Sequence, residues 1–315
     1  MFERLNFALV WRKRDEAMTI RACKAFSEPL EGARRRARAK RLTLAGLGLW
    51  FVAQAAQANI FVADRREQHD ASQPMLRSVG LIHHANAGAG GTAFLVSSCH
   101  IATAYHVAFI DGRNPRTGSI EISGPKIGHT ADFLIGPDPK VPSKFAARTR
   151  ATVVAFGRFS KSDFKGMAGD WAILRLDDCL GRKYGYLKYA RPDRKSPMPT
   201  GALMTIGFPR SRASQPGITV ETGCRARDHG PVAGLVGVDC AFESGMSGGP
   251  VLEQQSDGTW QVVGLIQQSM APVDGVLPEY SMAHRNQMVY VTAFQRALDN
   301  ALRSDVRRLL SEHAR

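Results

Sequence analysis

The sequence predicts an all-β fold that ends in one α-helix, and three observations support this class. Short segments rich in Val, Ile, Leu and Phe recur along the chain, separated by Gly, Pro, Ser and Asp. No strand–helix–strand alternation is present, which argues against a parallel α/β sheet. The C-terminal end carries apolar residues at helical spacing. Many short strands of this kind are typical of barrels and sandwiches.

The segments expected to form strands follow one another from residue 91 onwards. They are residues 91–96, 100–104, 151–159, 170–177, 202–208, 217–227, 234–242, 249–253, 260–268 and 287–292. Residues 181–201 contain Pro192, Pro197 and Pro199, so we expect an irregular connection between two halves there. An apolar stripe with arginines on the opposite face predicts a C-terminal helix that covers the core. The stripe consists of Phe294, Leu298, Ala301, Leu302, Val306, Leu309 and Leu310.

The first 58 residues have the order of a secretory signal peptide. The whole chain has 42 Lys and Arg against 28 Asp and Glu, a formal charge of +14, and residues 1–58 carry half of it. A basic cluster at residues 34–41 precedes an apolar run at residues 42–53, and Ala56-Gln57-Ala58 fits a cleavage site. We therefore expect the mature chain to begin near Asn59 and to be exported to the periplasm or the extracellular space.

Two other interpretations of this segment are open. The apolar run is shorter than the roughly 20 residues that span a bilayer, yet a leader that is not removed would tether the protein to a membrane. Met18 is a second possible start of the chain. The charge that remains after residue 58 is spread along the chain without a nucleic-acid-binding motif, so we expect no nucleic-acid partner.

Four cysteines follow the leader: Cys99, Cys179, Cys224 and Cys240. An even number in an exported chain suggests two disulfides, and four cysteines allow three pairings. We favour Cys99–Cys179 with Cys224–Cys240, and four buried free thiols are the alternative. A zinc site has little support because no two cysteines are spaced as CxxC.

Three segments place a residue that can take part in catalysis beside a predicted strand. They are Thr103-Ala104-Tyr105-His106, Asp170-Trp171-Ala172-Ile173-Leu174-Arg175-Leu176 and Gly245-Met246-Ser247-Gly248-Gly249-Pro250. In this order, with gaps of 64 and 77 residues, they resemble motifs of the trypsin-like serine peptidases. The family's motifs are Thr-Ala-Ala-His, Asp-(Ile/Trp)-Ala-Leu-(Leu/Ile)-(Arg/Lys)-Leu and Gly-Asp-Ser-Gly-Gly-Pro.

This resemblance covers most of the chain after the leader and implies a detailed architecture. Two antiparallel six-stranded Greek-key barrels would be followed by the C-terminal α-helix. Residues 1–58 would be the leader, 59–190 the first barrel with His106 and Asp170, 191–292 the second barrel with Ser247, and 293–315 the helix. The active site would then lie in the cleft between the barrels.

The chemistry implied is peptide-bond hydrolysis through a Ser-His-Asp triad. His106 would take the proton of the Ser247 hydroxyl, which is a weak nucleophile until a base does so. Asp170 would hold the imidazole tautomer and stabilise the imidazolium. The N–H groups of Gly245 and Ser247 would form an oxyanion hole, with glycine allowing the turn. We expect protein or peptide substrates, no metal or cofactor, and a monomer.

Nearby residues compete for these roles. Asp132, in the run Asp-Phe-Leu-Ile, is the second choice for the aspartate, and Ser244 lies in the same loop as the predicted nucleophile. His100 lies on the same hairpin as His106 and is expected to be structural.

Departures from the family pattern are informative. Met246 stands where pancreatic members have an aspartate that pairs with a freed N-terminal amine, and no Ile-Val-Gly-Gly-like start is present. We therefore expect competence after leader removal alone, and a chain closer to the bacterial exported branch that includes the glutamyl endopeptidases.

Three residues are expected to line the substrate pocket by the same resemblance. Ala241 matches the floor position where trypsin has an acid, while Gln267 and Ser269 belong to the wall strand. Without a counter-charge, the pocket favours a small or medium uncharged side chain. His284 and Arg285 could recognise an acidic side chain instead, although we expect them on a loop surface.

Two further functions are compared with the same motifs. Gly245-Met246-Ser247-Gly248-Gly249 satisfies the Gly-x-Ser-x-Gly pattern of esterases, but in that class the serine precedes its acid and histidine. A catalytically inactive binding protein on the same fold would have lost a triad residue, and none is lost.

Overall fold

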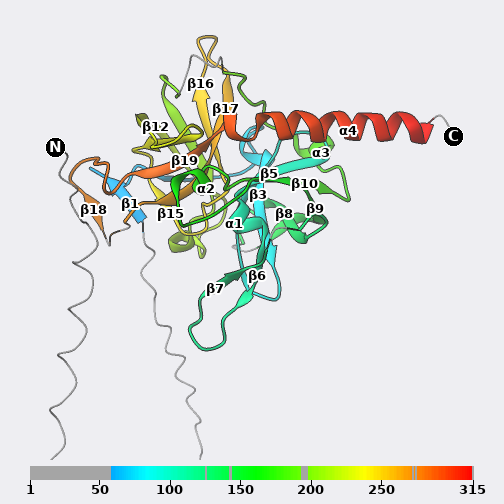
Figure 1. The fold of residues 1–315 in the computed structure, drawn as a ribbon, viewed down its shortest axis with the longest axis horizontal. Helices are drawn as coiled ribbons and strands as arrows, with labels where there is room; N and C mark the ends of the chain where they lie inside the picture. The colour runs from blue at the N-terminus through cyan, green and yellow to red at the C-terminus, as the bar shows by residue number, and fades with distance from the viewer. Residues whose placement is uncertain are drawn as a thin grey trace, which may run out of the picture. The chain divides into compact units, whose positions relative to one another are not determined.

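Six antiparallel strands close into a barrel in the first half of the chain (Figure 1). The structure is a computed structural model and describes residues 58–313 except 125, 142–143, 193–197, 272 and 274, so the expected leader lies outside it. The barrel order is β10-β5-β4-β3-β8-β9. The strands are β3 Val79–His84, β4 Ala89–Leu95, β5 His100–Thr103, β8 Thr130–Pro137, β9 Phe145–Phe156 and β10 Ala172–Leu176.

Alternating burial explains why these segments form a barrel. Along β8, Ala131, Phe133 and Ile135 are buried while the residues between them are partly exposed. Successive side chains of a strand point to opposite faces, so one face of β8 fills the barrel interior. Ile101 on β5 and Ile173 on β10 are fully buried as well. The interior is therefore apolar and closely filled.

The second half of the chain forms an eight-stranded antiparallel sheet of order β13-β14-β19-β17-β16-β11-β12-β2. Its strands are β2 Glu67–His69, β11 Leu203–Gly207, β12 Ile218–Cys224, β13 Ala226–His229, β14 Leu235–Val238, β16 Pro250–Gln254, β17 Trp260–Ser269 and β19 Asn286–Tyr290. In Figure 1, β12, β16, β17 and β19 lie together, beside the strands of the first barrel.

This sheet curls towards a second barrel. β12 and β13 lie near opposite ends of the strand order, yet only Arg225 separates them in the chain. Two residues span at most about 7 Å, so the ends of the sheet must approach each other. The Cys224–Cys240 disulfide, with a Cα–Cα distance of 5.0 Å, joins the same region. Counted as one bent strand, β12 and β13 make the second half six-stranded apart from β2, and the trypsin-like fold class is confirmed.

The segment after the expected leader pairs with the second half. β1 Ala58–Phe61 lies between β15 Phe242–Glu243 and β18 Val276–Leu277 in a three-stranded sheet, and β2 adds to the edge of β12. The sequence placed these residues with the first barrel. Strands as short as these take their partners from far along the chain, so local patterning did not reveal them.

The remaining elements are short connections. They are the one-turn helices α1 Tyr105–Ala108, α2 Phe164–Met167 and α3 Gly181–Tyr184, the 3₁₀ turns η1 Leu76–Ser78, η2 Arg210–Arg212 and η3 Val291–Ala293, and the ribbon of β6 Ile110–Arg113 and β7 Ile120–Ile122.

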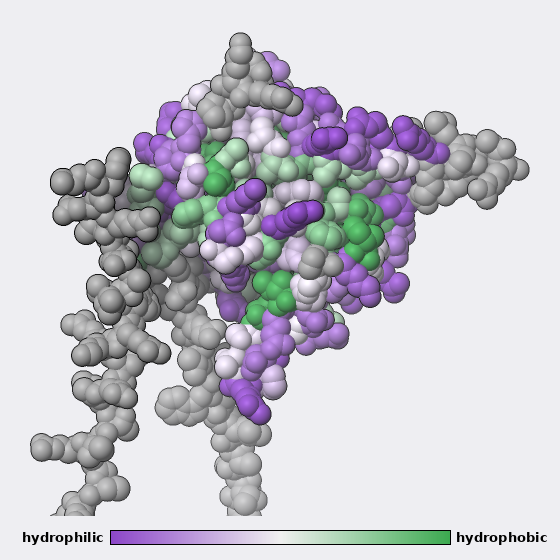
Figure 2. Space-filling view, in the orientation of Figure 1, coloured by the Kyte–Doolittle hydropathy of each residue, from purple (hydrophilic) through white to green (hydrophobic). Residues whose placement is uncertain are grey.

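The C-terminal helix α4, Gln295–His313, follows the second half but packs on β9 and β10 of the first barrel. Leu298 is fully buried, and Asp305 forms an ion pair with Arg175 on β10 at 3.0 Å. Figure 2 shows hydrophilic side chains along the outer side of this helix. The predicted docking helix is therefore confirmed, and it ties the two halves together. In the described part of the chain, no helix combines the length and apolarity needed to span a bilayer.

Candidate active site

His106 lies just beyond the end of β5, on the one-turn helix α1. Asp170 lies two residues before β10, which pairs with β5 in an antiparallel register that sets Ala172 opposite Thr103. Because the two strands are neighbours, the residues beyond their adjacent ends meet. The Asp170 carboxylate accepts a hydrogen bond from His106 Nδ1 at 2.8 Å and another from the His106 backbone N–H at 3.0 Å.

The two residues of this pair differ in burial. Asp170 is 1% exposed, whereas 23% of the His106 side chain is accessible. Because Nδ1 faces the Asp170 carboxylate, Nε2 is the ring nitrogen that Asp170 leaves unengaged. Burial and the charge of Asp170 raise the pKa of the neighbouring Tyr105 phenol, which stays neutral. The competing Asp132 lies on β8, where it pairs with Arg148, and His100 bonds Ser97 within its hairpin.

Ser247 lies in the turn between β15 and β16. Gly245 and Gly248 on either side have φ values of +96° and +82°, a region that favours glycine. A Cβ at Gly245 would lie 2.4 Å from the Phe208 carbonyl oxygen, and one at Gly248 would lie 2.1 Å from Thr103 Oγ1. The Ser247 turn therefore packs directly against the segment that leads from β5 to His106.

Each carbonyl group of this turn accepts a hydrogen bond. The Met246 N–H donates to the Glu243 oxygen at 3.0 Å, and the Arg210 N–H donates to Ser244 at 2.8 Å. Thr92 Oγ1 on β4 donates to Gly245 at 2.8 Å, which links the two halves. Within the described residues, the N–H groups of Gly245 and Ser247 have no backbone acceptor. The turn thus leaves free the two donors that the sequence assigned to an oxyanion hole.

A chain of hydrogen bonds joins Ser247 to the His106–Asp170 pair. Ser247 Oγ donates to the backbone oxygen of Gln267 at 3.2 Å, and the Gln267 side chain donates to the Met167 carbonyl at 3.0 Å. The same carbonyl accepts the Asp170 N–H at 3.1 Å. This network links Ser247 to the backbone of Asp170 through Gln267. Within the described residues, the Ser247 hydroxyl is bonded to the Gln267 oxygen and not to His106.

The expected pocket residues lie beside this network. Ser269 Oγ contacts the carbonyl oxygen of Phe242 at 3.4 Å, next to the buried Ala241. The Ala241 N–H donates to the Glu221 carboxylate at 2.6 Å, and Arg65 lies 3.3 Å from the same group. Burial raises the pKa of Glu221, although the Ala241 N–H and Arg65 act against it. Sequence reasoning missed Glu221 because it comes from β12, in no motif.

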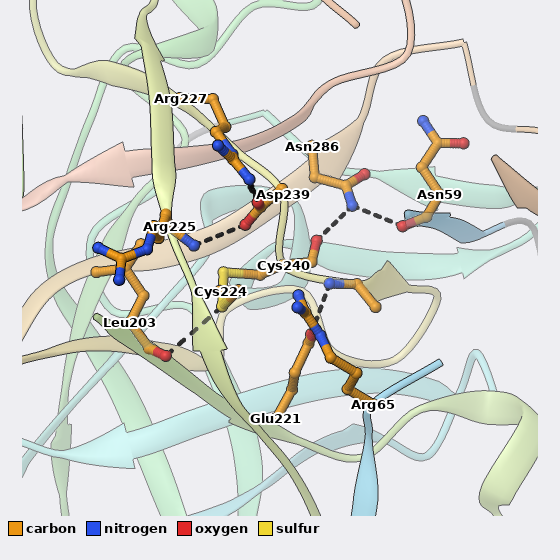
Figure 3. Close-up of a disulfide and its surroundings, with 11 residues drawn as sticks. Asn59, Arg65, Leu203, Glu221, Cys224, Arg225, Arg227, Asp239, Cys240 and Asn286 are labelled. Carbon is orange, nitrogen blue, oxygen red and sulfur yellow. Dashed lines mark hydrogen bonds and ion pairs between the residues drawn. A yellow bond between two sulfur atoms is a disulfide. The ribbon is translucent and has the colours of Figure 1, made fainter. Parts of the chain in front are cut away.

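Figure 3 shows the residues around Cys240, which directly precedes Ala241 in the chain. Both favoured disulfides, Cys99–Cys179 and Cys224–Cys240, are formed. Asn286 donates to the carbonyl oxygens of Cys240 and Asn59 at 2.6 and 2.8 Å. Asp239 and the two sulfur atoms lie within 4.8 Å of one another. The sulfurs are bonded to each other, and Asp239 accepts from the Arg225 N–H and from Arg227, so these atoms are already engaged.

One expectation about the surroundings is wrong. Arg285 was expected on a loop surface, but it is 5% exposed, because its guanidinium packs over the Phe164 ring, 5.9 Å from the centroid. Asp228 lies 3.9 Å from it. His284 is partly buried and bonds Ser281 at 3.1 Å.

A cavity of about 470 Å³ lies elsewhere, between the first barrel and the segment that leads into β12. It is lined by Leu81, Phe145, Phe208 and Pro216 among others, and by none of His106, Asp170 and Ser247. It is therefore separate from the hydrogen-bonded network.

Comparison with known proteins supports the family resemblance. The sequence model of the trypsin-like peptidase domain matches residues 91–265. Among solved structures, the chain is similar to a Glu endopeptidase in complex with MPD, with 17% identity and a TM-score of 0.50. That similarity covers 77% of this chain and 98% of the other, and at this identity it shows a shared fold. No curated protein sequence matches this chain.

Proposed function

The chain belongs to the family of trypsin-like peptidase domains, and we propose that it is a serine endopeptidase whose catalytic residues are His106, Asp170 and Ser247. The observation that carries the proposal is the hydrogen-bonded network. A buried carboxylate orients an accessible imidazole, and the serine that is linked to the Asp170 backbone through Gln267 lies in a turn with two unengaged N–H donors. This combination suits acyl transfer.

In the first step, the substrate carbonyl would lie between Ser247 Oγ and the N–H groups of Gly245 and Ser247. The hydroxyl, which donates to the Gln267 oxygen in the structure, would rotate to donate to His106 Nε2. As Oγ bonds to the carbonyl carbon, its proton passes to Nε2 and the carbonyl oxygen becomes an oxyanion. Asp170 stabilises the resulting imidazolium, and the two N–H groups stabilise the oxyanion.

In the second step, the C–N bond breaks and the imidazolium gives its proton to the leaving amine. Water then attacks the acyl-enzyme while His106 takes a proton from it, and the released acid restores Ser247. The partial exposure of His106 allows water to reach Nε2.

The substrate pocket is proposed to accept a small or medium uncharged side chain. Ala241 brings no charge, and the Glu221 carboxylate beside it is engaged by the Ala241 N–H and by Arg65. A library of peptides varied at the residue before the cleaved bond tests this preference. Strong cleavage after Arg, Lys or Glu would overturn it.

We also propose export to an oxidising compartment, removal of the leader near Ala58, and a monomeric enzyme. The two disulfides support such a compartment, and β1 begins at Ala58, next to the proposed mature start. N-terminal sequencing of protein from its native host should give Asn59 as the first residue. A native protein that keeps its leader would instead be membrane-tethered.

The proposed activity is tested by following hydrolysis of an unfolded protein and of peptide amides by the purified chain. We expect cleavage within the polypeptide that disappears in Ser247→Ala, while Ser244→Ala retains it. Equal hydrolysis by Ser247→Ala would overturn the proposal. A purified chain that cleaves no peptide would favour a binding protein on the same fold.

A further inference from the structure

A cluster of buried charges lies next to the serine turn and has no part in the steps above. Arg66 and Glu243 have side chains that are 4% and 1% exposed, and Arg66 Nη1 lies 2.7 Å from Glu243 Oε2. The two residues are 177 positions apart in the sequence. Glu243 is the residue from which the turn to Ser247 begins.

The Glu243 carboxylate is bonded on several sides. The Ser211 N–H donates to Oε1 at 2.6 Å, and the Ser211 hydroxyl donates to Oε2 at 2.7 Å. Ser211 belongs to η2, and the neighbouring Arg210 N–H holds the Ser244 carbonyl at 2.8 Å. The Glu243 side chain therefore fixes both the first residue of the turn and the segment that supports the second.

Arg66 is itself fixed from the other side. Its Nε and Nη2 donate to the two oxygens of Asp64 at 2.8 and 2.9 Å, a bidentate arrangement that sets the plane of the guanidinium. Arg212 lies 3.2 Å from the same carboxylate. Asp64, Arg66, Ser211, Arg212 and Glu243, here called the Arg66 cluster, thus form a rigid support for the turn.

The backbone of the turn needs such a support. Gly245 has a φ of +96°, and the hydrogen bonds accepted by the carbonyls of Glu243, Ser244 and Gly245 set the orientation of the peptide planes in the turn. A buried carboxylate that loses its cation is costly, so the Glu243 side chain would move towards solvent or change its partners. Such a movement at Glu243 would alter the direction of N–H groups two and four residues further on.

We propose that Arg66 is a positioning residue, which holds Glu243 so that the N–H groups of Gly245 and Ser247 point at the developing oxyanion. This inference rests on the proposed function. Arg66 lies eight residues after the expected cleavage site and within the segment that pairs with the second half. The support is therefore an internal side chain, and the free amine at the mature N-terminus is not required for it.

The direct test is Arg66→Met, compared with Arg66→Lys and with Arg175→Met as a control. Arg175 is also paired with an aspartate but lies on β10, facing α4. We expect kcat for a peptide amide to fall by about 10² to 10³, as when an oxyanion donor is lost, with KM changed by less than about threefold. Arg66→Lys should restore part of kcat because it keeps the charge, and Arg175→Met should leave kcat within about twofold.

A second readout does not depend on turnover. Amide hydrogen exchange of residues 243–249 should be at least about tenfold faster in Arg66→Met, while exchange in β5 and β10 stays unchanged. Unchanged exchange in the turn would overturn the proposal whether or not the chain is an active peptidase. A wild-type kcat per titrated active site in Arg66→Met would also overturn the proposal.

A third variant covers the case in which Arg66→Met does not fold. Arg66→Met/Glu243→Gln removes both charges and should fold, with faster exchange in the turn and a reduced kcat. A double variant with wild-type exchange and kcat would refute the role of Arg66. If the wild type shows no turnover dependent on Ser247, the proposed function fails separately.

Discussion

In the first half of the molecule, His106 and Asp170 lie at the ends of two neighbouring strands of a closed apolar barrel, whereas in the second half Ser247 lies on a turn among buried polar groups. Among the described residues, Asp170 is the one carboxylate buried in the first barrel. Arg66, Glu221, Asp239, Glu243 and Arg285 are all buried against the second half.

The two halves hold their parts of the site by different interactions. The register of β5 and β10 follows from the strand ladder, so apolar packing suffices to bring His106 to Asp170. The serine turn has left-handed backbone at Gly245 and Gly248, which regular pairing cannot hold. Specific hydrogen bonds and ion pairs hold it instead. Loss of packing should therefore affect stability in the first half, and loss of a polar contact should affect rate in the second.

The largest expected effect comes from the buried carboxylate of the first half, Asp170. Asp170→Asn should lower kcat by about 10⁴, because the amide no longer fixes the imidazole tautomer or stabilises its charge, while the melting temperature changes little. Asp132→Asn on the same barrel is the control and should leave kcat unchanged. Steady-state kinetics measure kcat in both variants. A similar loss of kcat in Asp132→Asn would show that the choice of Asp170 is wrong.

The next largest effect is a loss of stability when the apolar core of the first barrel is truncated. Phe133→Ala should reduce the free energy of unfolding by about 3 to 5 kcal/mol, because Phe133 is fully buried in the barrel. The kcat of the folded fraction should stay close to that of the wild type. Urea unfolding and active-site titration measure the two quantities. A loss of kcat per active site in Phe133→Ala would contradict the expectation that packing in the first half affects stability and not rate.

A smaller loss is expected at the disulfide that joins the ends of the curled sheet. Cys224→Ala/Cys240→Ala opens a loop with a sequence separation of 16 and should cost about 3 kcal/mol of stability. Since Cys240 precedes Ala241, KM should rise more than kcat falls. Denaturant unfolding and steady-state kinetics check both. An unchanged KM would show that the disulfide does not shape the pocket.

The smallest effect is a pH dependence in the Arg66 cluster. Burial acts to raise the pKa of Asp64, but the hydrogen bonds and charge of Arg66 lower it to about 2, below the ordinary value of 3.8. A depressed folded-state pKa contributes stability above about pH 4 and loses it as pH falls through about 2. After allowing for solvent screening, the contribution is about 1 to 2 kcal/mol.

Comparing the unfolding free energy of the wild type with that of Asp64→Asn separates the contribution of Asp64 from those of the other carboxyl groups. The difference in unfolding free energy between wild type and variant should be constant from about pH 7 to 5 and vanish towards pH 2. A difference that persists unchanged at pH 2 would show that Asp64 acts through something other than its charge.

Much of the fold and site could be predicted from local patterns. His106, Asp170 and Ser247 lie in short motifs that adjoin strands, and the helical spacing of Phe294 and Leu298 predicts α4. β8 was not predicted although Ala131, Phe133 and Ile135 alternate with outward residues, because the charged Asp132 interrupts its apolar character. The first part of β9 was missed because charged residues such as Arg148 and Arg150 interrupt its apolar character.

The supports of the serine turn could not be predicted in this way. Arg66 and Glu243 are 177 residues apart, and nothing in either local sequence marks an ion pair. The contact of Glu221 with the Ala241 N–H spans 20 residues and depends on how the sheet curls. Such polar contacts depend on the finished fold, which periodicity within a window does not contain.

The central claim is that Ser247 is a nucleophile activated by His106 across the two halves. The most direct measurement is mass spectrometric mapping of the residue labelled by a fluorophosphonate probe, in wild type and in His106→Ala. We expect one adduct on Ser247 that forms at least about 10³-fold more slowly without His106. No adduct on Ser247, or labelling that is equally fast without His106, would contradict it.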